Sequence, residues 1–220
     1  MIWQAAWVSL RLAFWTTAWL TVLGLPLAWW MARQRGRWCV CVEAIVTLPL
    51  VLPPTVLGFY LLWAMGASSP VGSVWHQITG SQLPFSFAGI LVGSILFNLP
   101  FAVRPFVAGF RSLDDRLIEA SWSLGVSGPQ TFMRIALPLA WPAILSGMVL
   151  TFAHAIGEFG VVLMLGGNLP GVTRTLSILI YDEVQAMNYP AAHRAALVLI
   201  VVASGLLMAV LSTQRWRDRA

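Results

Sequence analysis

The sequence is poor in charge and contains no lysine. Only 10% of its 220 residues are charged, all 13 basic residues are arginine, and 59% of the residues are hydrophobic. Soluble domains have about a quarter of their residues charged, so the composition excludes that class. Several apolar stretches reach the roughly 20 residues that a helix needs to cross a bilayer. The chain is therefore predicted to be an all-α integral membrane protein.

Cysteine and histidine are also scarce, which limits the sites that the chain can form. Cys39 and Cys41 are the only cysteines and no histidine lies near them, whereas a structural zinc site needs about four such ligands. The histidines are scattered and no acid cluster has ligand spacing, so neither a metal site nor an enzyme active site is visible. The G-x-x-x-x-G-K-S/T phosphate loop is absent as well. We expect this chain to bind no cofactor and to perform no nucleotide chemistry.

The arginines lie at the ends of apolar runs, as the positive-inside rule expects, rather than along one polar face. This argues against nucleic-acid binding. With five spans, the N-terminus outside and the C-terminus in the cytoplasm, all arginines except Arg11, Arg174 and Arg194 lie at or near the cytoplasmic side. Residues 1–220 are taken as one domain, with spans expected at about 12–31, 44–66, 86–110, 142–165 and 195–212.

The remaining outer segments are assigned to the membrane surface. Residues 1–10 place tryptophans at helical spacing, which is typical of a short interfacial helix. Residues 67–85 are expected to form a loop. Residues 176–187 have an apolar side but contain Asp182 and Glu183, so we expect a helix that lies at the outer surface or dips partway into the membrane rather than a further span.

Two spans contain residues that are unusual at membrane depth. Pro53 and Pro54 in the second span predict either a packing kink or a broken helix that lines the route through the membrane. Arg104 in the third span would either reach the headgroups or pair with a buried acid.

The fourth span contains His154 and Glu158, four residues apart and so on one helical face. They form either a gate element or a structural pair. Because Glu158 would repel an anion, we expect it to pair with His154 or Arg174. Arg174 itself could meet an anion or a receptor carboxylate, or be an ordinary loop arginine.

Residues 111–141 carry a polar, capped pattern between two apolar spans. Ser112 begins the first capping pattern, Gly125 is a typical helix stop, and Ser127 with Gln130 forms a second capping box. The sequence thus predicts two short cytoplasmic helices joined at a glycine corner.

The first of these helices has two apolar sides. Trp122 lies on one side, and it either helps to stabilise the membrane domain or fits a groove on a partner. The other side is a stripe formed by Leu113, Leu117, Ala120 and Leu124.

The same passage carries a family resemblance. Its pattern EAS…G…I.LP resembles the EAA loop of ABC-importer permeases, with Ser121 where alanine is usual; the matching residues are Glu119, Ala120, Gly125, Ile135, Leu137 and Pro138. The stretches LPLVLPPTVLGFYLL (48–62) and AIGEFGVVLMLGGNLPGVTRTLS (155–177) look like the molybdate permeases of that family. The resemblance covers nearly the whole chain.

The resemblance implies a type I importer fold in the bacterial inner membrane. A coupling helix would dock into a separate cytoplasmic ATPase dimer, which uses ATP and Mg, and a periplasmic oxyanion-binding protein would deliver the substrate. Five spans are few for a complete path, which favours a homodimer with the path on its two-fold axis. The expected coupling residues are Glu119, Ala120, Ser121, Trp122, Gly125, Leu137 and Pro138. The pathway or gate candidates are Pro53, Pro54, His154, Glu158, Phe159, Gly160 and Arg174.

Molybdate is the expected substrate, with tungstate or sulfate as the alternative. An ATP-independent channel or secondary transporter is a competing class, but it often shows two repeated halves, which this sequence lacks. A membrane enzyme is the third class.

Overall fold

The computed structural model describes the backbone of residues 1–34 and 36–217, and the side chains in this part except 206 and 209–217. All regular elements described are helical. They are α1 (Ile2–Arg33), α2 (Arg37–Val51), α3 (Pro54–Met65), α4 (Pro70–Thr79), α5 (Phe87–Arg111), α6 (Asp115–Ser123), α7 (Gly128–Thr131), a π-helical turn (Phe132–Ala136), α8 (Leu137–Ile156), α9 (Gly160–Gly166), α10 (Leu176–Gln185) and α11 (Tyr189–Arg217).

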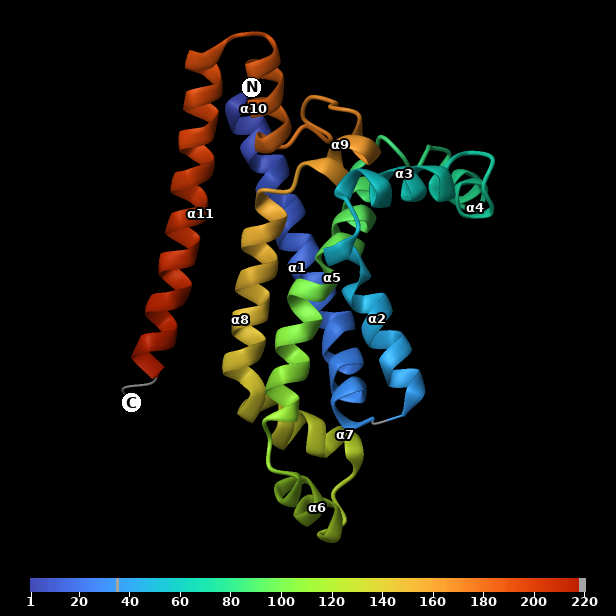
Figure 1. The fold of residues 1–220 in the computed structure, drawn as a ribbon, viewed down its shortest axis with the longest axis vertical. Coiled ribbons are helices and arrows are strands. Elements are labelled where there is room, and N and C mark those ends of the chain that lie inside the picture. The colour runs from blue at the N-terminus through green and yellow to red at the C-terminus, as the bar shows by residue number, and fades with distance from the viewer. Residues whose placement is uncertain (35, 218–220) are drawn as a thin grey trace.

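Three long helices, α1, α5 and α8, pack side by side and form the centre of the molecule (Figure 1). Phe106 of α5 is fully buried between Leu20 of α1 and Ile144 of α8 in the main core cluster. A Cβ on Gly147 would lie 2.7 Å from Phe106, so the absence of a side chain there allows α8 to approach α5 closely. These contacts make the three helices one packed body.

The five-span count is not confirmed. In the described residues, α1, α5 and the continuous stretch Gly128–Ile156 are long and apolar enough to cross a membrane, and α2 with α3 makes a fourth span only if the bent pair counts as one. In α11 the apolar part that could be assessed, Tyr189–Gly205, is shorter. Helix α11 joins the bundle mainly through α10 and runs beside α8 (Figure 1).

The predicted interfacial helix at residues 1–10 is wrong, because these residues are the first turns of α1. Ala5, Ala6 and Ser9 are buried, and the Ser9 hydroxyl accepts a hydrogen bond from the backbone N–H of Leu176 at 2.8 Å. Contact with α10 therefore extends α1 outward as one continuous helix.

The second predicted span is broken at Leu52–Pro53, where α2 and α3 meet at 112°. Pro53 and Pro54 have no N–H, so the helical ladder cannot continue through them. The broken-helix alternative is therefore the one that the structure supports. Helices α3 and α4 extend sideways from the bundle (Figure 1).

The predicted loop 67–85 contains a helix, α4. Ser69 caps its start by accepting a hydrogen bond from Gly72 N at 2.9 Å, and Gly80 ends it with a φ of 69°. The short Ser-Pro start and the glycine stop are the local signals that the loop assignment overlooked.

The fourth predicted span, 142–165, has both ends misplaced. The helix is continuous from Gly128 and ends at Ile156, after which Gly157 interrupts it and α9 begins separately at Gly160. The expected surface helix at 176–187 is present as α10.

Candidate functional site

The water-facing corner formed by α6 and α7 lies at one end of the bundle, opposite α3, α9 and α10 (Figure 1). Asp114 caps α6 by accepting a hydrogen bond from Arg116 N at 2.9 Å. The predicted Ser112 cap is wrong: Ser112 ends α5 and donates its hydroxyl to Gly109 O at 2.8 Å. Gly125 makes the corner with a φ of 76°, which favours glycine.

The expected second capping box, Ser127 with Gln130, is present at the start of α7. The helix that begins there does not stop before the membrane but continues into α8 through the π-helical turn. Pro138 cannot donate a backbone hydrogen bond, and the turn just before it bonds Leu137 N to Phe132 O instead. Leu137 and Pro138 thus lie at the base of α8 rather than on α6.

The face of α6 that points into the protein is formed by Ile118 and Ser121, which are 1% and 4% exposed. The Ser121 hydroxyl donates to Ile118 O at 2.7 Å and shares a hydrogen bond of 2.9 Å with the Thr131 hydroxyl of α7. The leucine stripe of α6 faces outward in its middle and at its end, where Leu117 is 49% and Leu124 is 83% exposed. Ser121, the departure from the usual alanine, fastens the two helices of the corner together.

Trp122 is half-exposed and lies beside the end of α1. The Arg33 guanidinium is 5.2 Å from the centroid of the Trp122 ring and 4.6 Å from that of Trp29, and it approaches Asp115 at 3.7 Å. Each of these exposed contacts is worth about 1 kcal/mol or less. Together they orient α6 against α1 while leaving an apolar outer face, with Glu119 and Ala120 exposed beside it.

A buried polar cluster lies nearer the other end of the bundle. Glu158 is 4% exposed, and its Oε2 accepts hydrogen bonds from the Ser94 hydroxyl at 2.7 Å and from Asn98 Nδ2 at 2.9 Å. Asn98 Oδ1 is also 2.8 Å from His154 Nδ1, which must donate because an amide oxygen only accepts. In the described part of the chain, Glu158 Oε1 has no hydrogen-bond partner.

The expected direct pairing of Glu158 with His154 or Arg174 is wrong. Helix α8 ends at Ile156, so Glu158 has left the helical face that carries His154, and Asn98 bridges the two. Ser94 and Asn98 were missed from the sequence; their signal is two polar residues four apart in an otherwise apolar helix.

The two breaks in the helices touch each other beside this cluster. A Cβ on Gly160, the first residue of α9, would lie only 2.7 Å from Cβ of Pro54, so the start of α9 packs directly on the start of α3. Pro53 is the N-cap residue just before α3, and the centroid of the Phe159 ring lies 5.0 Å from that of the Tyr181 ring. These four candidates, Pro53, Pro54, Phe159 and Gly160, are therefore brought together near Glu158.

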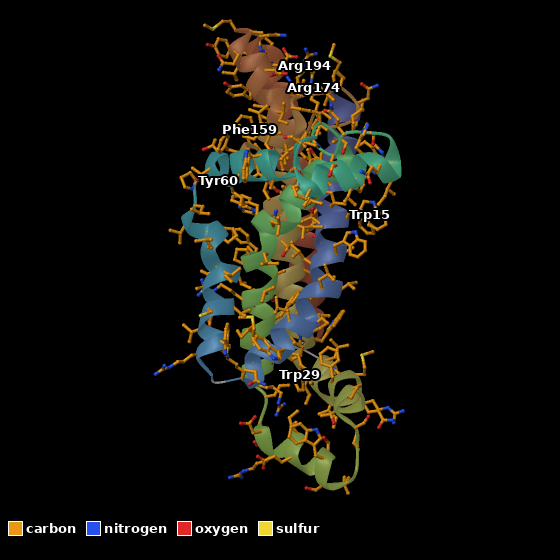
Figure 2. The ribbon with its side chains drawn as sticks, turned by 90° about the vertical axis from the view of Figure 1, so that its right-hand side faces the viewer. Trp15, Trp29, Tyr60, Phe159, Arg174 and Arg194 are labelled. Carbon is orange, nitrogen blue, oxygen red and sulfur yellow. The ribbon has the colours of Figure 1, made fainter. Side chains whose placement is uncertain are left out.

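Arg174 lies apart from the cluster and is already paired. Its Nε donates to Asn168 Oδ1 at 2.6 Å, and its Nη2 is 3.6 Å from Asp182 Oδ2 on α10. Figure 2 shows Arg174 at the end of the molecule opposite Trp29, which lies next to the α6–α7 corner. Its contacts are those of an arginine that fixes the loop between α9 and α10.

The geometry is that of a helical membrane protein, with three or four stretches in the described residues that are long and apolar enough to cross a bilayer. No group of three side chains suited to hold a metal comes together within the described residues. The α6–α7 corner lies at one end of the bundle, and the two touching helix breaks lie near the other end.

The chain belongs to the family of binding-protein-dependent transport system inner membrane components, which matches residues 24–218. It is 44% identical over 210 residues to the molybdenum transport system permease protein ModB of Azotobacter vinelandii, covering 96% of this chain and 93% of that protein. The probable sulfate transport system permease protein cysT of Chlorella vulgaris is 30% identical, over 96% of this chain and 79% of that protein.

Solved structures confirm the importer fold. A bacterial ABC transporter involved in the import of alginate superposes with a TM-score of 0.79 at 20% identity, covering 96% of this chain and 78% of that one. At this identity the likeness concerns the fold alone.

Proposed function

We propose that this chain is the permease subunit of an ATP-driven importer that moves molybdate across the bacterial inner membrane. The higher identity to a molybdenum permease than to a sulfate permease, 44% against 30% at equal coverage of this chain, supports molybdate over sulfate. Tungstate or sulfate is the alternative substrate. No enzymatic step is assigned to the chain itself.

The observation that carries the proposal is the exposed apolar face of α6. Ile118 and Ser121 fix the helix from behind. Leu117 and Leu124 are left at the surface on one side of these buried residues, and the half-exposed Trp122 lies on the other side. Exposed apolar side chains on a rigid helix are suited to a groove on a protein partner. The partner is a cytoplasmic ATPase dimer, which consumes ATP with Mg and moves α6 together with α7 and the base of α8.

The assembly follows from this arrangement. Two copies of the chain form the path on a two-fold axis, and a periplasmic oxyanion-binding protein delivers the anion on the side away from α6. The arginines near α6 support a cytoplasmic position for that end, as the positive-inside rule expects, and the proposed orientation has the N-terminus outside and the C-terminus inside.

The buried polar cluster acts in the gate rather than as an anion ligand. An ionised Glu158 repels a dianion, and its partners Ser94 and Asn98 occupy one of its oxygens. The cluster holds α5 to the α8–α9 corner, next to the contact between Gly160 and Pro54. Arg174, fixed by Asp182, holds the outer loop in place.

The test is reconstitution of the chain with its ATPase and binding protein in proteoliposomes. ATP-dependent uptake and ATP hydrolysis are compared with molybdate, tungstate and sulfate. Molybdate is expected to give the strongest stimulation of both. Flux of the anion through the chain without ATP would overturn the proposal. Stimulation of uptake and ATP hydrolysis by sulfate alone would identify sulfate, not molybdate, as the substrate.

A further inference from the structure

Arg104 is a cationic residue of α5 without a counter-charge. In the part of the chain that the structure describes, it makes neither an ion pair nor a hydrogen bond. It precedes Arg111, at the end of α5, by seven residues, which places it about 10 Å along the helix axis from that end. An ionised side chain at this depth is costly and commonly marks an ion pathway.

Arg104 lines a cavity of about 540 Å³ between α2 and α5, at the end of the bundle nearer α6. This volume is within the range of small-ligand sites. Among the α5 residues that line it, four are spaced three, four and three positions apart and so share one helical face: Phe101, Arg104, Ala108 and Arg111. The facing wall includes Glu43 and Thr47 of α2.

The charges in this cavity do not balance. Arg111 Nη2 lies 3.6 Å from Glu43 Oε2, which accounts for one of the two guanidinium groups. Arg104 is left unmatched, and the Thr47 hydroxyl is a further donor on the opposite wall. Two guanidinium groups and a hydroxyl around one cavity offer hydrogen-bond donors and positive charge, which are what a tetrahedral oxyanion needs.

We propose that Arg104 and Arg111 form a binding station for a tetrahedral oxyanion in the cytoplasmic half of the path. The inference rests on the proposed function, since the anion is the transported substrate. Glu43 competes with the anion for Arg111, which keeps binding weak enough for release. Arg104 supplies the attraction that Glu158, near the other end, cannot supply.

A phosphate oxyanion also occurs on lipid headgroups, and Arg104 is exposed in the single chain. The two sources share one chemistry and differ in location. A transported anion enters from water and competes with other soluble oxyanions, whereas a lipid phosphate depends on the bilayer composition. The experiment therefore varies the lipid and the soluble anion separately.

The test uses a thiol introduced by Ala108→Cys, between the two arginines, in a complex that carries Cys39→Ala and Cys41→Ala. The rate of its reaction with a negatively charged methanethiosulfonate reagent is measured in nanodiscs of neutral phosphatidylcholine, with and without millimolar molybdate or sulfate. The anion is expected to slow the reaction at least about fivefold. Arg104→Gln should abolish this protection, Arg104→Lys should keep part of it, and Arg194→Gln, on the exposed outer part of α11, should leave it unchanged.

Uptake provides a second measurement. Arg104→Gln is expected to lower oxyanion uptake about tenfold or more, which is the scale of one lost charge-assisted hydrogen bond. ATP hydrolysis by the same complex should stay within about twofold, because α6 is unchanged. A purely structural role would lower both together and overturn the inference.

Two other results would also overturn it. One is equal protection in the Arg104→Gln variant. The other is slowing of the reaction only when phosphatidylglycerol is added, which would identify an anionic lipid headgroup, rather than a soluble oxyanion, as the ligand. If the parent complex imports molybdate and no anion protects the thiol, the oxyanion station at Arg104 and Arg111 is refuted while the proposed function stands. If the parent complex shows no ATP-driven uptake of any oxyanion, the proposed function fails whatever the thiol reports.

Discussion

Replacing Asn98 by leucine tests whether the buried polar cluster holds the gate region together. Asn98 is fully buried and makes two hydrogen bonds to other segments, one to Glu158 at 2.9 Å and one to His154 at 2.8 Å. Hydrogen bonds between membrane helices are worth about 0.6 kcal/mol on average and up to about 1.7 kcal/mol. Leucine has the same number and branching of side-chain heavy atoms as asparagine, and loss of two such bonds should therefore cost roughly 1–3 kcal/mol of unfolding free energy.

The assay is reversible unfolding of the purified chain in mild detergent, titrated with a denaturing detergent. Thr151→Val is the matched control, because Thr151 is equally buried but its hydroxyl bonds only to Gly147 O of its own helix. We expect less than about 0.5 kcal/mol for that variant. A double-mutant cycle of Asn98→Leu with Glu158→Gln should be non-additive, since the two side chains share a bond. Additive costs, or an Asn98→Leu variant as stable as the parent, would show that the buried polar cluster does not hold these segments together.

Three further predictions concern the corner and the breaks. Leu124→Asp, at a side chain that is 83% exposed, should leave stability unchanged but lower ATP hydrolysis stimulated by the binding protein at least about tenfold, because it places a charge in an apolar contact. Leu124→Met, which keeps the side chain apolar, is the control, and full stimulation by Leu124→Asp would count against α6 as the docking helix. Gly160→Ala should lower the free energy of unfolding by about 1–3 kcal/mol, because its Cβ would lie 2.7 Å from Cβ of Pro54. Gly128→Ala, whose Cβ would have nothing within 4 Å, is the control and should be neutral or stabilising in the same unfolding assay. Equal effects of the two changes would contradict the contact between the helix breaks. Glu158→Gln should change the ratio of uptake to ATP hydrolysis and leave the preference among molybdate, tungstate and sulfate intact, and a changed preference would make Glu158 a ligand instead.

Local signals in the sequence were sufficient for the corner and for α10. Gly125, the Ser127–Gln130 box and the mixed polarity of α10 depend on residues a few positions apart, and each is found as expected. The family pattern then identified the importer fold, which the structural likeness confirms.

Features that depend on contacts between residues far apart in the sequence could not be predicted from such local signals. Helix α6 has apolar residues on two sides, and only the hydroxyl of Thr131, ten positions from Ser121, shows which side faces inward. The pairing of Glu158 required knowing that α8 ends at Ile156 and that Asn98, 60 positions away, lies opposite. Likewise, the burial of Ser9 against Leu176 makes the first residues part of α1.

If a partner moves α6, as we propose, the breaks between α2 and α3 and between α8 and α9 are where the helices are expected to change their angle. Helix α5 runs from the Arg111–Glu43 pair near α6 to Ser94 and Asn98 beside Glu158 without an interruption. Helix α5 packs closely against α8 at a glycine, because a Cβ on Gly109 would lie only 2.6 Å from Cβ of Ala143. A force on the corner therefore moves the packed helices as one body over most of their length.

The helical hydrogen-bond ladder is interrupted at places next to this body, where we expect the helix angles to change. These places are Leu52–Pro53 between α2 and α3, and Gly157–Phe159 between α8 and α9. The two interruptions touch through Gly160 and Pro54, so a change of angle at one requires a change at the other. Glu158 lies within the second interruption and is bonded to α5. The polar cluster therefore lies where α5 meets the interruption between α8 and α9, and it holds there a buried carboxylate whose Oε1 has no hydrogen-bond partner among the described residues.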